Sequence, residues 1–211
     1  MFQDLIKYLQ INNSYLFQQF IRHFLISIYG VLIAAIVAIP LGFYLARHKK
    51  LANWVISLAN IIQTVPSLAM LSIVMAVLGL GPNTVIATVF LYSILPILKN
   101  TYTAVSNVDE NILDVAKGMG MTRNQVLMKV ELPLSLSVIM GGLKNAMVLG
   151  IGITTIGTFI GAGGLGDIIS RGINVSNGSD IILAGAIPTA LMAVIVDILL
   201  SIVEKKLDKT T

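Results

Sequence analysis

Long uncharged stretches alternate along this chain with short groups of charged residues. Phe24 to Ala46 contains no charged residue over 23 positions, and a basic group at 47–50 follows it directly. About 20 apolar residues at 1.5 Å each are enough to cross the 30 Å hydrocarbon core of a bilayer. This stretch is therefore predicted to be a membrane-spanning helix.

A second uncharged stretch, Leu51 to Leu98, covers 48 residues and is too long for one helix. It contains Gly79-Leu80-Gly81-Pro82-Asn83, a strong turn signal that divides it in two. The pattern as a whole predicts an all-α integral membrane protein in which residues 1–211 form a single transmembrane domain. The expected spans cover residues 24–46, 51–78, 84–104, 134–160 and 181–203, and a Gly-rich polar segment, 161–180, precedes the last.

Pro66 interrupts the second expected span shortly after Gln63 and Thr64. Proline has no N–H to donate, and the backbone groups that it frees are tolerated inside a membrane only where protein or a wet cavity satisfies them. We expect a kink at this position rather than a full break.

Composition supports this class of protein. Hydrophobic residues make up 56% of the chain and charged residues 11%, and the mean hydropathy is +0.88, whereas about a quarter of residues are charged in soluble domains. Too little sequence remains for a separate soluble domain of roughly 100 residues. The net charge of +4 is spread over loops that flank the spans, which argues against nucleic-acid binding. With no cysteine, and with His23 and His48 on opposite sides of one span, no metal site is expected.

The distribution of basic residues predicts the orientation, because Lys and Arg in short loops stay cytoplasmic. Five spans with the 47–50 group inside also place the loop 99–131 and the C-terminal tail inside. That arrangement gathers ten of the fourteen basic residues on one side. The N-terminus is then outside, and the polar start, 1–22, argues against a cleaved signal peptide.

The hydrophilic loop between the third and fourth spans is predicted to form two short helices. Asn107 can cap the first helix, Gly118 and Gly120 loosen or end it, and Thr122 with Gln125 forms a capping box for the second, which is expected to end before Leu132-Pro133. Helices this short are marginal alone, so their apolar faces indicate a partner surface, although packing against the chain's own membrane helices would also cover them.

The same loop resembles the EAA loop of the permease subunits of binding-protein-dependent ABC importers. That motif reads EAA, three residues, G, nine residues, I-x-LP, and this chain departs from its start by Asp for Glu and Val for Ala. The residues that match it in position are Asp114, Val115, Ala116, Gly120, Val130, Leu132 and Pro133, with Gly118 inside the motif. The resemblance implies a type I importer permease whose loop docks into an ATP-hydrolysing subunit as a coupling helix.

Further strings are similar to the permeases of the osmoprotectant branch, which import glycine betaine, carnitine or choline. They cover most of residues 63–197 and include QTVPSLAML, LYSILPILKNTYTAVSNVD, IGTFIGAGGLG and GAIPTALMAVIVD. The resemblance implies a transporter subunit rather than an enzyme, embedded in the cell membrane. It implies as partners a second permease, identical or related, two ATPase subunits that bind the ATP and Mg²⁺, and an external substrate-binding protein. A permease for another small solute, such as an amino acid, is the alternative, and a stand-alone channel is a more remote one.

Such a permease needs only weak polar contacts along its path, and several residues are candidates for them. They are Gln63, Thr64, Pro66, Thr154 and Thr158, with Thr155 beside the last two. Thr154 and Thr158 are expected to share a helix face at a spacing of four, although a threonine can equally bond its own helix backbone.

A second candidate group is a gate or helix-packing segment formed by Gly161, Gly163, Gly164 and Gly166, together with the intramembrane Asp197. Asp197 either bonds a neighbouring helix or lines the path, and Lys144 either snorkels to the inner boundary or pairs with a helix. Gly164 to Asp167 also matches the GxGD string of intramembrane aspartyl proteases. That chemistry needs two converging carboxylates, and the expected positions of Asp167 and Asp197 near opposite membrane faces argue against it.

Overall fold

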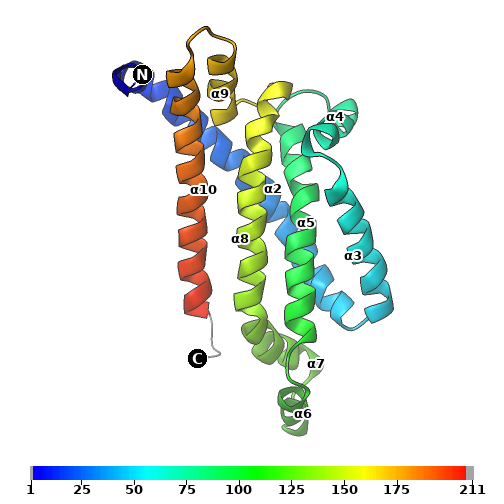
Figure 1. Ribbon diagram of the computed structural model, residues 1–211. Helices are drawn as coiled ribbons and strands as arrows, with labels where there is room; N and C mark the ends of the chain where they lie inside the picture. Colours follow the sequence, from blue (N-terminus) through cyan, green and yellow to red (C-terminus); the bar gives the residue numbers. More distant parts are fainter. Residues whose placement is uncertain (1, 208–211) are drawn as a thin grey trace.

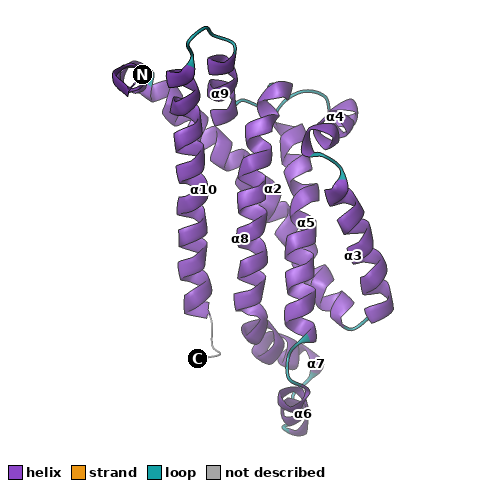
Figure 2. Ribbon diagram, in the orientation of Figure 1, coloured by secondary structure: helices purple, strands orange, loops and turns teal. Residues whose placement is uncertain are grey.

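The computed structural model describes residues 2–207, which form helices and no strands (Figures 1 and 2). Four helices are long and apolar enough to cross a membrane. Their bounds are α2 (Asn13–Ala46), α5 (Pro82–Ser106), α8 (Leu132–Ile156) and α10 (Ser179–Leu207). A bent pair, α3 (Lys49–Thr64) and α4 (Ser67–Leu78), makes a fifth span if the two are counted together. The prediction of five spans in an all-helical fold is thus consistent with the structure.

The second span is broken at Pro66, not kinked, so the expected kink was wrong. Val65 is extended, and α3 and α4 meet at an angle of 100°. The hydroxyl of Tyr92, on α5, donates to the carbonyl oxygen of Val65 and satisfies this backbone acceptor at the break. The bend is therefore stabilised by another helix, as irregular backbone at membrane depth requires.

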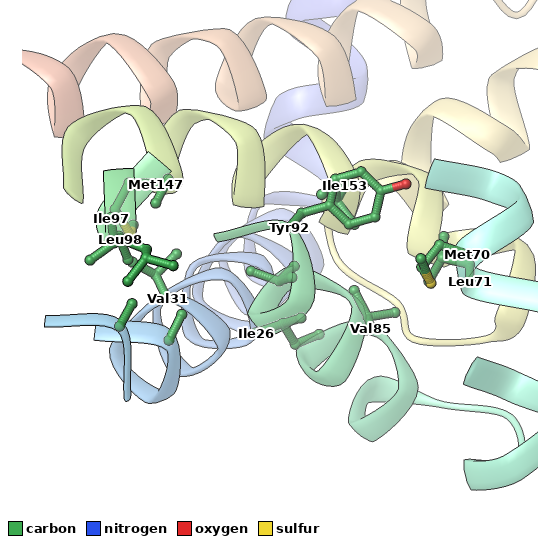
Figure 3. Close-up of a cluster of buried hydrophobic side chains, with 14 of the residues drawn as sticks. Ile26, Val31, Met70, Leu71, Val85, Tyr92, Ile97, Leu98, Met147 and Ile153 are labelled. Carbon is green, nitrogen blue, oxygen red and sulfur yellow. The ribbon is translucent and has the colours of Figure 1, made fainter. Parts of the chain in front are cut away.

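Helix α5 lies at the centre of the bundle, with α2 and α8 packed along it (Figure 1). Side chains from α2, α4, α5 and α8 meet in one apolar core, in which Figure 3 labels Val31, Leu71, Val85 and Met147. Glycines allow close approach between these helices. A Cβ atom at Gly42 of α2 would lie 2.6 Å from a Thr101 methyl group, and one at Gly142 of α8 would lie 2.8 Å from the Pro96 carbonyl oxygen.

The two ends of the bundle carry different accessory helices. At one end, here called the α9 end, lie α1 (Phe2–Ile11), which packs on α10, and α9 (Leu165–Ile173). Helix α9 was not predicted, because its sequence lies within the Gly-rich segment 161–180. At the other end, here called the α6 end, α6 (Glu110–Gly118) and α7 (Arg123–Val126) project from the bundle.

The loop between α5 and α8 forms two helices, as predicted, but two of its expected boundaries were wrong. Asp109, not Asn107, caps α6, because its carboxylate accepts the backbone N–H of Asn111 at 2.8 Å. The Thr122–Gln125 capping box is confirmed. The helix that it opens continues through a π-helical turn, Leu127–Glu131, directly into α8, so Leu132-Pro133 does not end it.

Candidate functional site

An open cavity of about 700 Å³, here called the polar cavity, lies between α3, α5, α8 and α10. Its wall combines amide, hydroxyl and charged groups with apolar surface. The lining residues are Gln63, Leu95, Pro96, Lys99, Asn100, Thr103, Asn145, Val148, Leu149 and Asp197. The cavity thus places polar groups from four membrane-spanning segments around one space.

Gln63 forms part of this wall through a specific backbone contact. Pro96 has no N–H, so the carbonyl oxygen of Tyr92, four residues earlier in α5, lacks its usual helical donor. The side-chain amide of Gln63 donates to that oxygen at 2.7 Å. Together with the bond from the Tyr92 hydroxyl to Val65, this contact fastens the end of α3 to α5. Gln63 therefore borders the cavity and also holds the broken span in place.

The other predicted path residues lie elsewhere. Thr64 is exposed and donates to the Ile61 carbonyl oxygen at 2.7 Å, and neither it nor Pro66 lines the polar cavity. Thr154 is fully buried, donates to the Gly150 carbonyl oxygen at 2.8 Å and lies 2.9 Å from the Ser27 hydroxyl.

The geometry expected for Thr158 was wrong. Helix α8 ends at Ile156, and Thr158 lies in a separate 3₁₀ turn, Gly157–Ile160. Thr154 and Thr158 therefore do not share the face of one α-helix. Thr155 donates to the Ile151 carbonyl oxygen at 3.1 Å. This is a bond to its own helix backbone, the alternative to a path contact for these threonines.

The glycine segment before α9 has two kinds of glycine. Gly161, Gly163 and Gly164 have φ values of 73°, 74° and 85°, in the left-handed region that favours glycine. Gly166 has a different constraint, because a Cβ atom there would overlap the Thr155 carbonyl oxygen. The predicted gate or packing segment is thus a tight turn followed by a close helix contact.

His23 anchors this turn to the bundle and was missed as a functional residue, since the sequence placed it at the membrane surface. It is completely buried on α2. Its Nδ1 accepts the Leu165 backbone N–H at 3.2 Å, so the other ring nitrogen, Nε2, carries the hydrogen and donates to the Ile151 carbonyl oxygen at 3.0 Å. Gln19, one turn earlier, accepts the Gly164 N–H at 2.6 Å. These contacts join α2, α8 and the start of α9.

Asp167 belongs to the α9 end. Its carboxylate accepts the Tyr15 hydroxyl at 2.6 Å and the Arg171 Nε at 2.9 Å. Asp197 lies 18 residues into α10 from Ser179, about 27 Å along a helix. The two carboxylates therefore do not converge, as the sequence indicated.

The loop at the α6 end presents apolar side chains to solvent. Val115 is 64% exposed and Met119 is 78% exposed, whereas Ala116 and Val126 are buried. Gly120 forms the elbow between α6 and α7 with φ of 77°, and Gly118 is the last residue of α6. The Asp114 carboxylate accepts from Lys117 at 2.9 Å on the exposed surface of α6. Val130 falls in the π-helical turn, and Leu132 and Pro133 begin α8.

An ion pair that the sequence did not predict joins this loop to α2. The Arg47 guanidinium lies 2.6 Å from the carboxylate of Glu131, which is almost completely buried. Arg47 follows the last residue of α2, and Glu131 ends the π-helical turn. The pair ties the base of the loop to the end of a membrane-spanning helix.

Comparisons with known proteins show extensive similarity. Residues 30–209 match the family described as "Binding-protein-dependent transport system inner membrane component". The chain is 61% identical to the carnitine transport permease protein OpuCD of Listeria monocytogenes, over 98% of this chain and 92% of that protein. It is 59% identical to the glycine betaine/carnitine/choline transport system permease protein OpuCD of Bacillus subtilis, over 97% of this chain and 90% of that protein.

A solved structure has the same fold. The TM-score is 0.80 between this chain and a chain from a structure of inward-facing conformations of the MetNI methionine ABC transporter. The match covers 91% of this chain and 95% of the other, at 17% sequence identity. At that identity the likeness concerns the fold alone.

Proposed function

Because the chain belongs to the family of binding-protein-dependent transport system inner membrane components, we propose that it is the membrane-spanning subunit of an ATP-driven importer of osmoprotectants. The observation that carries the proposal is identity of 59% and 61%, over nearly the whole chain, to permeases named for glycine betaine, carnitine and choline transport. The type I importer permease fold is confirmed, and the protein is a transporter subunit and not an enzyme.

The family implies an ATPase and a substrate-binding protein as partners. The chain itself has no GxxxxGK[ST] nucleotide-binding motif, which fits ATP and Mg²⁺ binding by separate ATPase subunits. The loop 105–132 is the surface that those subunits contact in this proposal. Support comes from the exposed side chains of Val115 and Met119. Exposed apolar side chains on a small projecting helix are typical of a surface that another protein covers.

The α6 end faces the cytoplasm in this proposal, and the α9 end faces outward. Nine of the fourteen basic residues belong to the loops and tail assigned to the α6 end, and a tenth, Lys99, lies in the last two turns of α5 at the same end. An odd number of spans places the two ends of the chain on opposite sides of the membrane. This agrees with the structure, in which α1 lies at the α9 end and the last turn of α10 lies at the α6 end (Figure 1). The substrate-binding protein would then deliver its ligand at the α9 end.

The polar cavity is the part of the path that this subunit contributes. It is open, and a second permease, identical or related, would complete its wall. The turn 161–166 closes the outer end, and its bonds to His23 and Gln19 make it move together with α2. Thr154 lies away from this cavity, where it bonds Ser27 of α2 and its own helix backbone.

Motion starts at the other end of the same helix. ATP binding closes the ATPase subunits and draws the coupling loops together, and the Arg47–Glu131 pair transmits that displacement to α2. A displaced α2 carries the 161–166 turn with it, so the outer gate and the coupling loop respond to the same event. Hydrolysis then restores the inward-facing state.

The likeness to a methionine transporter structure gives no support to an amino-acid substrate, since 17% identity concerns the fold alone. A test compares bacteria that lack all other osmoprotectant uptake, with and without this chain and the proteins encoded beside it. We expect cells with the complete set to accumulate labelled glycine betaine and to grow at high salt when it is supplied. Accumulation of an amino acid, with no uptake of glycine betaine, carnitine or choline, would refute the substrate proposal.

A further inference from the structure

Two oppositely charged side chains without partners face the polar cavity. In residues 2–207, neither Lys99 of α5 nor Asp197 of α10 takes part in an ion pair or side-chain hydrogen bond, and both line this cavity. A lysine on the neighbouring helix α8 behaves differently. Lys144 of α8 contacts Glu204 of α10 at 3.3 Å and the Ser201 hydroxyl at 3.3 Å.

Both unpaired residues lie within the membrane-spanning helices. Lys99 is seven residues before the end of α5 and Asp197 is ten residues before the end of α10, or about 10 Å and 15 Å from the α6 end at 1.5 Å per residue. A charge at such a depth is expensive unless it is paired or faces a water-filled space, and there it marks the path of a polar solute. The cavity therefore retains two charges that a ligand can neutralise.

The chemistry of this wall suits one class of solute. A carboxylate attracts a quaternary ammonium group by charge alone, because that group has no hydrogen to donate. An ammonium group such as that of Lys99 attracts a carboxylate and can also donate to it. In the same wall, Val148 and Leu149 offer apolar surface for methyl groups, and Asn145 offers an amide.

We propose that the polar cavity is a weak transit site for small zwitterions, in which Asp197 faces the quaternary ammonium group and Lys99 faces the carboxylate. The inference rests on the proposed function and assigns a substrate site within this subunit. Glycine betaine and carnitine carry both groups, whereas choline carries the ammonium group and a hydroxyl. Lys99 therefore distinguishes the zwitterions from choline, while Asp197 serves all three.

The test uses the complete transporter, with both permeases, the ATPase and the substrate-binding protein, reconstituted in liposomes. Maximal uptake rates are measured for glycine betaine and choline at saturating substrate and binding protein, per transporter inserted. K99Q should slow glycine betaine uptake about fivefold, the effect of the attraction of about 1 kcal/mol between unit charges 4 Å apart in water. It should not slow choline uptake, because choline has no carboxylate, and K99R should restore glycine betaine uptake.

K144Q is the matched control, because it removes a lysine charge whose partners lie on α10, outside the wall of the polar cavity. It should keep the wild-type ratio of the two rates. D197N is the second variant and should slow both substrates several-fold.

The inference is overturned if K99Q transports glycine betaine at the wild-type rate, if it slows choline equally, or if K144Q changes the ratio in the same way. If K99Q does not assemble, unchanged rates in D197N overturn it. A wild-type transporter that moves neither substrate contradicts the proposed function instead.

Discussion

Gly120 offers a sharp test of the coupling loop, because its backbone conformation requires glycine and crowding by neighbouring atoms does not. Its φ is 77°, and among the described residues no atom lies within 4 Å of the place that a Cβ would occupy. An L-residue in the left-handed region costs about 1–2 kcal/mol. A substitution should therefore act by strain at the elbow between α6 and α7, which reduces the population of the native elbow about 5- to 30-fold.

The chain provides a matched control two residues away. A Cβ added at Gly118 would also have no described atom within 4 Å, but this residue has ordinary helical φ at the end of α6. G118A should therefore be neutral or slightly stabilising, since alanine favours helix over glycine. Asparagine tolerates the left-handed region better than alanine does, so the order of activity at position 120 should be Gly, then Asn, then Ala, then Val.

The assay measures ATP hydrolysis and substrate uptake in the same liposomes, with the binding protein and its ligand present. G120A should lower uptake about tenfold and should lower the number of substrate molecules moved per ATP, while the variant still inserts and assembles. Equal activity of G120A and G118A would refute the strain argument. Equal activity of wild type and G120V would refute the coupling role of the elbow.

Three further predictions concern packing, the broken span and orientation. G142A should lower the free energy of unfolding by about 1–3 kcal/mol, because its Cβ would lie 2.8 Å from the Pro96 carbonyl oxygen. G141A is the control and should be nearly neutral, since the atom nearest to its Cβ would lie 3.8 Å away. Thermal unfolding in detergent compares the two variants, and equal unfolding midpoints would contradict the packing. Q63L leaves the Tyr92 carbonyl oxygen without its side-chain donor and should cost about 1–3 kcal/mol in the same assay, so a wild-type midpoint would show that the bond is dispensable. In this cysteine-free chain, a cysteine replacing Ser176 should react with an impermeant maleimide in intact cells and one replacing Lys50 should not, and the reverse result would invert the topology.

The features that the sequence predicted well are set by residues close together in the chain. The spans follow from uninterrupted apolar stretches, and the Thr122–Gln125 capping box needs only residues three apart. Their ends were less accurate: α2 begins at Asn13, well before the expected start at residue 24, because its first turns pack against the α9 end of the protein itself. Asp109 and Asn107 are both good capping residues, and local pattern could not choose between them.

What the sequence missed depends on contacts between distant segments. The break at Pro66 is stabilised by Tyr92, 27 residues from Val65, and the turn at 161–166 is held by His23, 142 residues from Leu165. Glu131 finds Arg47 at a separation of 84 residues. Such contacts follow from the packing of the helices and have no local signal. Asp197 within an otherwise apolar span and Lys99 near the end of another were visible in the sequence, but only the fold places both on one cavity.

The most direct test of the whole account is ATP-driven uptake by the reconstituted transporter, with this chain present or omitted. Liposomes that contain this chain, its companion permease and the ATPase should accumulate labelled glycine betaine, carnitine or choline only when ATP is inside and the substrate-binding protein is outside. Omission of this chain should abolish uptake. Uptake that persists without ATP, or that needs no ATPase subunit, would contradict the account and would identify the protein as a channel.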